Sequence, residues 1–161
     1  MLQLYDKLIE LPLFIGISTD ELSDIVGQTK FGFHKLVADK QLVSTDDKCT
    51  QLFFLMSGTL CVVSYADNYR YRIEEELSAP AVIQPEHLFG LQQRYTKDFI
   101  AQSDCSLLSL DKAEVLRLID SYLIFRLNLL NSISMQAQRM RRIPRRVQPR
   151  GIRQQFVPFL R

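Results

Sequence analysis

The spacing of hydrophobic residues changes twice along the chain. Leu22, Ile25 and Val26 recur at helical spacing after Ser18–Glu21, a segment whose Ser and Glu have the form of a capping box. From about residue 30 to residue 110, short runs rich in Phe, Val, Ile and Tyr alternate with turn-forming residues, which is typical of antiparallel strands. From residue 111 the spacing is helical again. The pattern predicts a helix, then an all-β region, then C-terminal helices.

The β region contains many short strands with regular turns between them. Such a pattern predicts a small barrel or sandwich, because closure of the sheet removes exposed strand edges. The clearest pair of strands is Gln51–Met56 and Thr59–Tyr65, joined by Ser57 and Gly58. Because Gly58 can adopt the positive φ that a two-residue turn requires, we expect these two strands to form a hairpin.

Two consecutive helices are predicted after residue 110. Asp111 is expected to be the N-cap of the first, with Glu114 in its first turn. A bend is expected at residues 120–122, followed by a longer helix over residues 122–143. Pro144 lacks an amide hydrogen and clashes with the preceding turn, so the longer helix is predicted to end at Ile143.

The longer helix carries two neighbouring apolar stripes. The stripe expected to face a second copy of the chain contains Leu123, Leu127, Leu130, Ala137 and Met140. The stripe beside it contains Phe125, Leu129, Ile133 and Gln136. One face can pack on the chain's own β region and the other on a partner, which predicts a homodimer. The alternative is a core helix in a monomer, because periodicity does not show what a face packs against.

Composition indicates one main domain in a reducing compartment. The chain has 161 residues, of which 47% are hydrophobic, enough for one proper core. Its three cysteines are widely spaced and form no CxxC pair, so neither a disulfide framework nor a zinc site is expected. The N-terminus lacks a basic start followed by a long apolar run, which argues against a signal peptide or membrane span. We therefore expect a cytoplasmic protein without a membrane partner.

The charge is distributed unevenly. Residues 1–120 hold 11 Lys and Arg against 18 Asp and Glu, whereas residues 121–161 hold nine Arg and no acidic residue. The basic segment expected to lie near DNA contains Arg141, Arg142, Arg145, Arg146, Arg150 and Arg153. A solvated helix surface followed by a tail is the alternative interpretation, since charge alone does not distinguish the two.

The order of elements resembles the cyclic-nucleotide-binding effector domain of CRP/FNR transcription regulators. The resemblance covers about residues 8–143 and includes a leading helix introduced by Leu11–Leu22 and a strand segment, Leu52–Leu60. It implies a mainly β fold with flanking helices, namely a double-stranded β-helix or jelly roll over residues 1–110. A short helix and a long dimerisation helix would follow over residues 111–143. Residues 144–161 would form a basic linker and the start of an incomplete C-terminal DNA-binding domain.

In that family a DNA-reading helix-turn-helix follows the long helix. Gly151–Leu160 is similar to the opening helix of this second domain, and a recognition helix needs roughly twenty further residues. We therefore expect DNA to be a partner only of a full-length protein that carries the missing helix-turn-helix. The chain would otherwise be a regulator that has lost its DNA-reading part.

The family binds its nucleotide through a Phe-Gly-Glu segment and a later Arg-Ser/Thr-Ala segment. The resemblance places Phe89 and Gly90 on the first segment but Leu91 on its Glu, and Tyr95–Lys97 on the second. Because the carboxylate for the ribose and the Arg for the phosphate are both missing, cyclic AMP is not expected to be the effector, and the cofactor is unknown. A different small anionic effector could use the remaining cations. The candidate ligand-binding residues are Phe89, Gly90, Arg94, Tyr95, Thr96 and Lys97.

The sequence offers little other chemistry. His34 and His87 are the only histidines, and His87 is expected to lie in a surface turn rather than in a ligand or haem site. Glu74–Glu76 is expected to be a solvated loop. No nucleophile, metal or phosphate-loop motif occurs, so neither an enzyme nor a metal site is predicted.

Two functions remain open at this point. The first is the effector-sensing and dimerisation domain of a CRP/FNR-type DNA-binding transcription regulator that does not respond to cyclic AMP. The second is a stand-alone ligand-binding or adaptor module that regulates a partner protein. The nucleotide sequence downstream of the Arg161 codon should distinguish them, since only the first predicts an in-frame helix-turn-helix.

Overall fold

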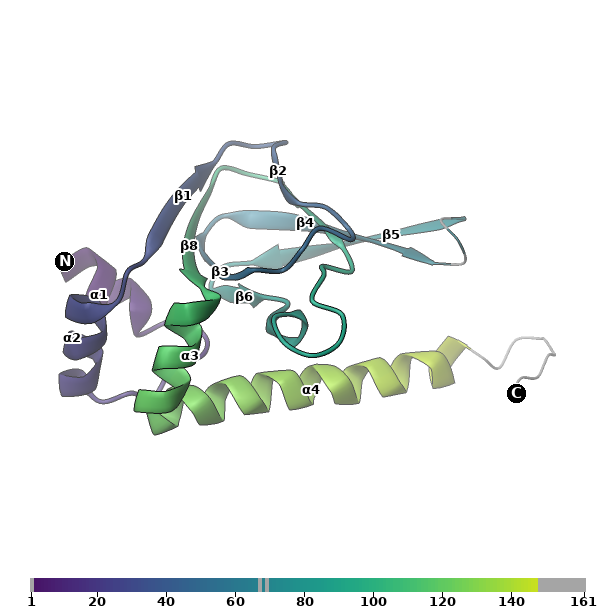
Figure 1. Cartoon of the computed structure of the whole chain (residues 1–161). Helices are drawn as coiled ribbons and strands as arrows, with labels where there is room; N and C mark the ends of the chain where they lie inside the picture. The colour runs from purple at the N-terminus through teal and green to yellow at the C-terminus, as the bar shows by residue number, and fades with distance from the viewer. Residues whose placement is uncertain (1, 67, 69, 148–161) are drawn as a thin grey trace.

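The fold is seen in a computed structural model that describes residues 2–66, 68 and 70–147 (Figure 1). The helices are α1 (Leu2–Leu8), α2 (Thr19–Gln28), the 3-10 helix η1 (Pro85–His87), α3 (Lys112–Ser121) and α4 (Leu123–Val147). The strands are β1 (Gly32–Leu36), β2 (Gln41–Val43), β3 (Gln51–Ser57), β4 (Thr59–Ala66), β5 (Tyr71–Ser78), β6 (Ala81–Ile83), β7 (Asp98–Ala101) and β8 (Cys105–Asp111). The predicted order of helix, β region and C-terminal helices is confirmed.

The strands form two four-stranded antiparallel sheets, in the orders β1-β8-β3-β6 and β2-β7-β4-β5. Leu52, Phe54 and Leu60 are completely buried, so the core lies between strands of both sheets. The predicted jelly-roll class is therefore confirmed. Glu74–Glu76 belongs to β5, an exposed edge strand, and the expectation of a loop there is wrong.

The predicted hairpin around Ser57 and Gly58 is wrong. β3 pairs with β6 and β8 in one sheet, whereas β4 pairs with β5 and β7 in the other, so these two residues form a corner between the sheets. Gly58 does have a positive φ of +95°, and a Cβ there would clash with the carbonyl oxygen of Asp104. The corner therefore needs glycine for its backbone conformation and for its close packing.

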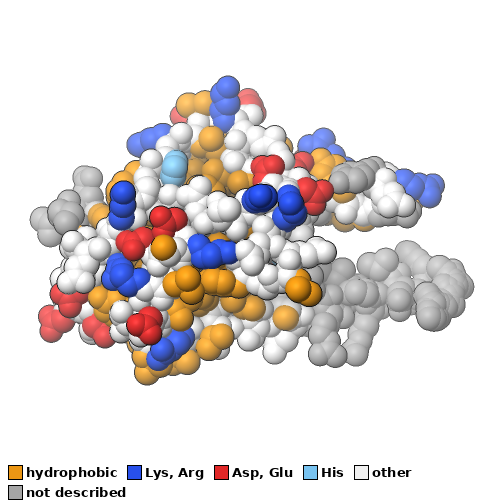
Figure 2. Space-filling model, in the orientation of Figure 1, with side chains coloured by type: hydrophobic (Ala, Val, Ile, Leu, Met, Phe, Trp, Pro, Cys, Tyr) orange, Lys and Arg blue, Asp and Glu red, His pale blue; other side chains and the backbone are white. Residues whose placement is uncertain are grey.

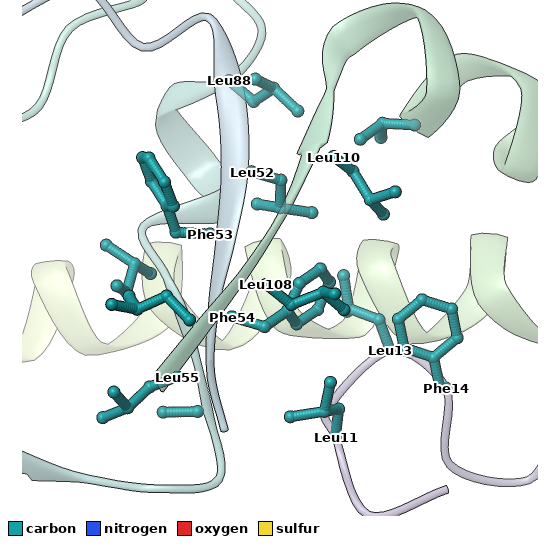
Figure 3. Packing of buried hydrophobic residues seen from close by; sticks show 14 of the residues in the cluster. Leu11, Leu13, Phe14, Leu52, Phe53, Phe54, Leu55, Leu88, Leu108 and Leu110 are labelled. Atoms are coloured by element: carbon teal, nitrogen blue, oxygen red, sulfur yellow. The ribbon is translucent and has the colours of Figure 1, made fainter. Parts of the chain in front are cut away.

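The N-terminal segment, the first sheet and α4 share one core (Figure 3). The ring centroid of Phe14 lies 5.5 Å from that of Phe54 in β3 and 5.3 Å from that of Phe125 in α4. Phe14, Phe54 and Phe125 are all completely or almost completely buried. These contacts fix α4 against the rest of the domain, which matters because α4 forms a wall of the cavity described below.

The predicted helix signals are mostly confirmed. The Oγ of Ser18 accepts a hydrogen bond from the Glu21 amide at 3.2 Å, and Oδ1 of Asp111 accepts one from the Glu114 amide at 3.0 Å. Tyr122 separates α3 from α4, at the predicted bend.

The predicted end of the long helix at Ile143 is wrong, because α4 continues through Pro144 to Val147. A single proline removes one helical hydrogen bond, and a helix of 25 residues retains the others. None of the described helices combines the length and hydrophobicity needed to cross a membrane.

Candidate functional site

A cavity of about 470 Å³ lies between the second sheet, η1 and α4. We refer to it as the roll cavity. Val62, Ile83 and Phe99 supply apolar parts of its lining from three different strands. Its polar lining comes mainly from η1 and its flanking residue, the segment before β7, and the inner face of α4. It therefore combines apolar walls with a small number of converging polar groups, as ligand sites usually do.

Gln84 connects two of these segments. It is the N-cap of η1 and has φ +41° and ψ +56°, in the left-handed region. Its Nε2 donates a hydrogen bond to Oγ1 of Thr96 at 2.8 Å, and its Oε1 accepts one from the backbone amide of Thr96 at 3.1 Å. The carboxamide thus ties η1 to the segment that enters β7.

Glu86 and His87 follow on η1, which packs against α4. Their side chains are only 15% and 16% exposed, and Oε2 of Glu86 lies 3.8 Å from Nε2 of His87. The other carboxylate oxygen, Oε1, is buried and has no hydrogen-bond partner within the described part of the chain. The prediction that His87 lies in a surface turn is wrong, because η1 turns both side chains toward the roll cavity.

The remaining charged groups of the roll cavity come from β5, the segment before β7, and α4. Nζ of Lys97 lies 4.0 Å from Oε1 of Glu75, and Glu76 and Arg139 also line the cavity. Oε2 of Glu76 accepts a hydrogen bond from Nε2 of Gln102 at 2.9 Å, beside a different hollow, so its carboxylate lies on the other face of the second sheet. The carboxylates of Glu75 and Glu86 are therefore set against the cations of Lys97 and Arg139 in the described lining.

Only part of the predicted ligand-binding set reaches the roll cavity. Thr96 and Lys97 line it, but Arg94 lines a separate surface hollow of about 590 Å³ with Asp46 and Lys48. There Nη1 of Arg94 donates a hydrogen bond to the carbonyl oxygen of Asp46 at 2.7 Å. The structure therefore does not bring Arg94 together with Thr96 and Lys97.

The other predicted ligand-binding residues, Phe89, Gly90 and Tyr95, do not line the roll cavity. Gly90 is exposed at φ +96° with no atom within 4 Å of a built Cβ, and Phe89 is half-buried with Nζ of Lys112 5.4 Å from its ring centroid. Tyr95 is buried, and its hydroxyl donates a hydrogen bond to the carbonyl oxygen of Gln51 at 3.2 Å. Burial, followed by the neighbouring Cys49, raises the pKa of Tyr95 far above its usual range. Tyr95 is therefore a core residue.

Sequence reasoning missed Gln84 and Glu86. The Phe-Gly pair of the resemblance indicated Phe89 and Gly90, which follow the end of η1 by two and three residues and do not line the roll cavity. The left-handed residue at the cavity is Gln84 instead. The signal that could have identified this turn is Pro85, two residues after the end of the strand Ala81–Ile83, since proline is favoured in the first turn of a helix.

The two faces of α4 differ as predicted. Phe125 and Leu129 are buried against the roll, whereas Leu123, Leu127 and Leu130 are 54%, 44% and 55% exposed. Figure 2 shows hydrophobic side chains gathered at the surface over the helical layer of the molecule. Ala137 is also exposed, and the side chain of Met140 lies outside the described residues.

The predicted basic segment lies at the C-terminal end of the chain. Arg141, Arg142, Arg145 and Arg146 belong to the last turns of α4, although their side chains are not described. Arg150 and Arg153 lie outside the described residues.

Comparison with solved structures identifies the same fold in three regulatory proteins. The catabolite activator protein of Thermus thermophilus is 19% identical with a TM-score of 0.69, and the alignment covers 84% of this chain and 61% of that one. The sensor domain of the transcriptional regulator DNR from Pseudomonas aeruginosa is 16% identical with a TM-score of 0.68, over 86% and 91% of the two chains. The regulatory subunit of a cAMP-independent protein kinase A from Trypanosoma brucei is 12% identical with a TM-score of 0.65, over 83% and 45%.

The sequence itself also matches a family model. No curated protein sequence matches the chain. Residues 33–122, more than half of the chain, match the model of the cyclic nucleotide-binding domain, and this segment runs from β1 to the end of α3. Together with the two-sheet roll, this match shows that the chain belongs to the cyclic nucleotide-binding domain family.

Proposed function

We propose that this chain is the effector-sensing and dimerisation half of a CRP/FNR-type DNA-binding transcription regulator that does not respond to cyclic AMP. The observation that carries the proposal is that one face of α4 lines the roll cavity while another face is exposed. Gln136 and Arg139 of this helix line the roll cavity, while Leu123, Leu127 and Leu130 are exposed. A ligand in the cavity would therefore contact the same helix that a second copy of the chain would cover.

The exposed leucines support a dimer. Burying a fully exposed leucine stabilises a complex by about 1.5–3 kcal/mol, and these half-exposed side chains would contribute part of that each. Pairing about a two-fold axis would place each stripe against its own copy in the partner. Ala137 continues the exposed stripe toward the C-terminal end of α4.

The polar lining of the roll cavity supports the absence of a cyclic AMP response. A cyclic phosphate is held well by the fork of an arginine. Arg94, the arginine next to Thr96 and Lys97 in the sequence, lines a different hollow, and the arginine that does line the roll cavity, Arg139, comes from α4 and is exposed. The loss of such a contact costs about 2–5 kcal/mol, which weakens a micromolar site to the millimolar range. The carboxylates of Glu75 and Glu86 in the same cavity repel a phosphate and offset the cations of Lys97 and Arg139.

The arginines after residue 120 support a nucleic-acid partner for the whole protein. This part of the chain contains nine Arg and no acidic residue, so it would be attracted to DNA phosphates. In a dimer, the C-terminal ends of both α4 helices would bring these arginines together.

A stand-alone module that regulates a partner protein is the second candidate. It is favoured by the likeness of the roll to a kinase regulatory subunit. Chromatin immunoprecipitation of the protein expressed from its own gene distinguishes the two. Enrichment of discrete genomic DNA sites supports the regulator, whereas recovery of a partner protein without enriched DNA contradicts it and supports the module.

A further inference from the structure

We propose that Gln84 is a specificity-determining residue that closes the Thr96–Lys97 corner of the roll cavity to phosphate and other anions. The proposal rests on the roll cavity being the effector site of the proposed function. The carboxamide of Gln84 occupies the place that an anionic ligand would take. The polar groups of Thr96 at this corner therefore already have hydrogen-bond partners within the chain.

The hydrogen bonds of Thr96 carry the proposal. A backbone amide and a hydroxyl at the edge of a cavity are groups that ordinarily hold an anion. Here the Thr96 amide donates to Oε1 of Gln84 at 3.1 Å, and Oγ1 of Thr96 accepts from Nε2 of Gln84 at 2.8 Å. An anion would have to displace the Gln84 carbonyl oxygen, which already fills the acceptor position, and would leave the carboxamide without its partners.

Lys97, which follows Thr96 in the sequence, is also paired with another side chain of the chain. Nζ of Lys97 lies 4.0 Å from Oε1 of Glu75, and both side chains are substantially exposed, so this ion pair is weak. It nevertheless lowers the positive potential at the corner. Glu86 lines the same cavity, and with Glu75 it offsets the charges of Lys97 and Arg139. The corner therefore has no excess of positive charge to attract an anion.

The backbone of Gln84 provides independent support. A glutamine at φ +41° is in a conformation that glycine adopts without strain and that other residues adopt rarely. Strain of this kind persists where the surrounding structure over-determines it, often next to a binding site. Gln84 is half-buried, and its carboxamide makes both of these hydrogen bonds to Thr96. The same two hydrogen bonds therefore hold the strained backbone and fill this corner of the cavity.

Substitution of Gln84 tests the proposal directly. Gln84→Gly removes the carboxamide and relieves the backbone, and Gln84→Asn tolerates the left-handed region but is one methylene too short to retain both contacts. Gln93→Gly is the matched control, because the carboxamide of Gln93 bonds the carbonyl oxygen of Gly90 and Nζ of Lys112 and does not line the roll cavity. Calorimetric titration would use cyclic AMP and inorganic phosphate, and amide NMR shifts would locate binding at Thr96.

We expect no measurable binding to the unaltered chain or to Gln93→Gly. For Gln84→Gly we expect affinity for both probes to rise at least about tenfold above the detection limit, with shifts at Thr96. Gln84→Asn should gain binding in the same direction. Adding Lys97→Ala to Gln84→Gly should remove the gain.

Two results would overturn the proposal. One is binding of cyclic AMP to the unaltered chain as tight as to Gln84→Gly, and the other is the absence of any gain in a folded Gln84 variant. Circular dichroism shows which variants are folded, and Gln84→Asn decides the question if Gln84→Gly does not fold. Light scattering on the same samples reports the oligomeric state, so failure of the proposed dimer would be recognised separately from failure of the role of Gln84.

Discussion

The ring of Phe14 packs against the ring of Phe125, with 5.3 Å between their centroids. This contact joins the N-terminal segment to the first turn of α4, and Asn128 reinforces it through hydrogen bonds to the carbonyl oxygens of Leu13 and Ile15, both at 2.8 Å. The start of α4 is therefore fixed on the domain. Its C-terminal half runs past η1 and the roll cavity (Figure 1).

Removal of the Phe125 ring should destabilise the domain strongly. Phe125→Ala deletes a completely buried ring and its contact with Phe14, so the free energy of unfolding should fall by about 3–5 kcal/mol. Urea denaturation followed by circular dichroism measures this. Leu116→Ala is the control, because Leu116 is half-exposed on α3 and its loss should cost about 1 kcal/mol or less. Equal losses in the two variants would show that the Phe14–Phe125 contact does not anchor α4.

Asp98 should make the free energy of unfolding fall at acidic pH. Burial raises the pKa of Asp98, but hydrogen bonds from the amide and hydroxyl of Thr45 and from the hydroxyl of Tyr65 outweigh it and lower the pKa. A lowered folded-state pKa gives stability that is present above the unfolded pKa of about 3.9 and is lost as the pH falls through the folded value.

Asp98→Asn should therefore lower the free energy of unfolding by about 1–3 kcal/mol at pH 7 and flatten its decline below about pH 4. Urea denaturation at a series of pH values gives both quantities. Asp6→Asn, at an exposed position on α1, controls for the loss of one negative charge. An unchanged acid dependence in Asp98→Asn would contradict this assignment.

Glu86 should lower the stability of the folded chain. Its Oε1 is buried without a partner among the residues described, and an unsatisfied buried polar group typically costs about 1–3 kcal/mol. Glu86→Met keeps most of the volume and should raise the free energy of unfolding by a similar amount. Glu10→Met, at an exposed site, should change it by about 0.5 kcal/mol or less. A loss of stability in Glu86→Met would show that the carboxylate stabilises the fold.

Local signals in the sequence predicted the elements well. The caps at Ser18 and Asp111, the bend at Tyr122 and the two faces of α4 depend on residues within one or two turns of each other. Periodicity and capping report such short-range relations directly. They do not report which strands pair, so the same Ser57-Gly58 signal fitted a hairpin and the observed corner between sheets equally well.

The candidate site was predicted less well, because its residues are joined by tertiary contacts. Thr96 was identified through the resemblance, but its partner Gln84 is twelve residues away and carries no pattern that indicates a left-handed backbone. His87 was assigned to a surface turn because composition does not reveal burial. The mistaken helix end at Ile143 has another cause, since proline disfavours the interior of a helix without excluding it.

The molar mass of the chain in solution tests the central claim most directly, because sensing and dimerisation are proposed to meet on α4. Light scattering coupled to size exclusion, at micromolar concentration, should give twice the mass of one chain. Leu127→Glu combined with Leu130→Glu should give the mass of one chain with an unchanged circular dichroism spectrum, since these side chains are exposed in the single copy. Leu116→Glu on α3 is the matched control and should remain dimeric. A mass of one chain for the unaltered protein would contradict the account.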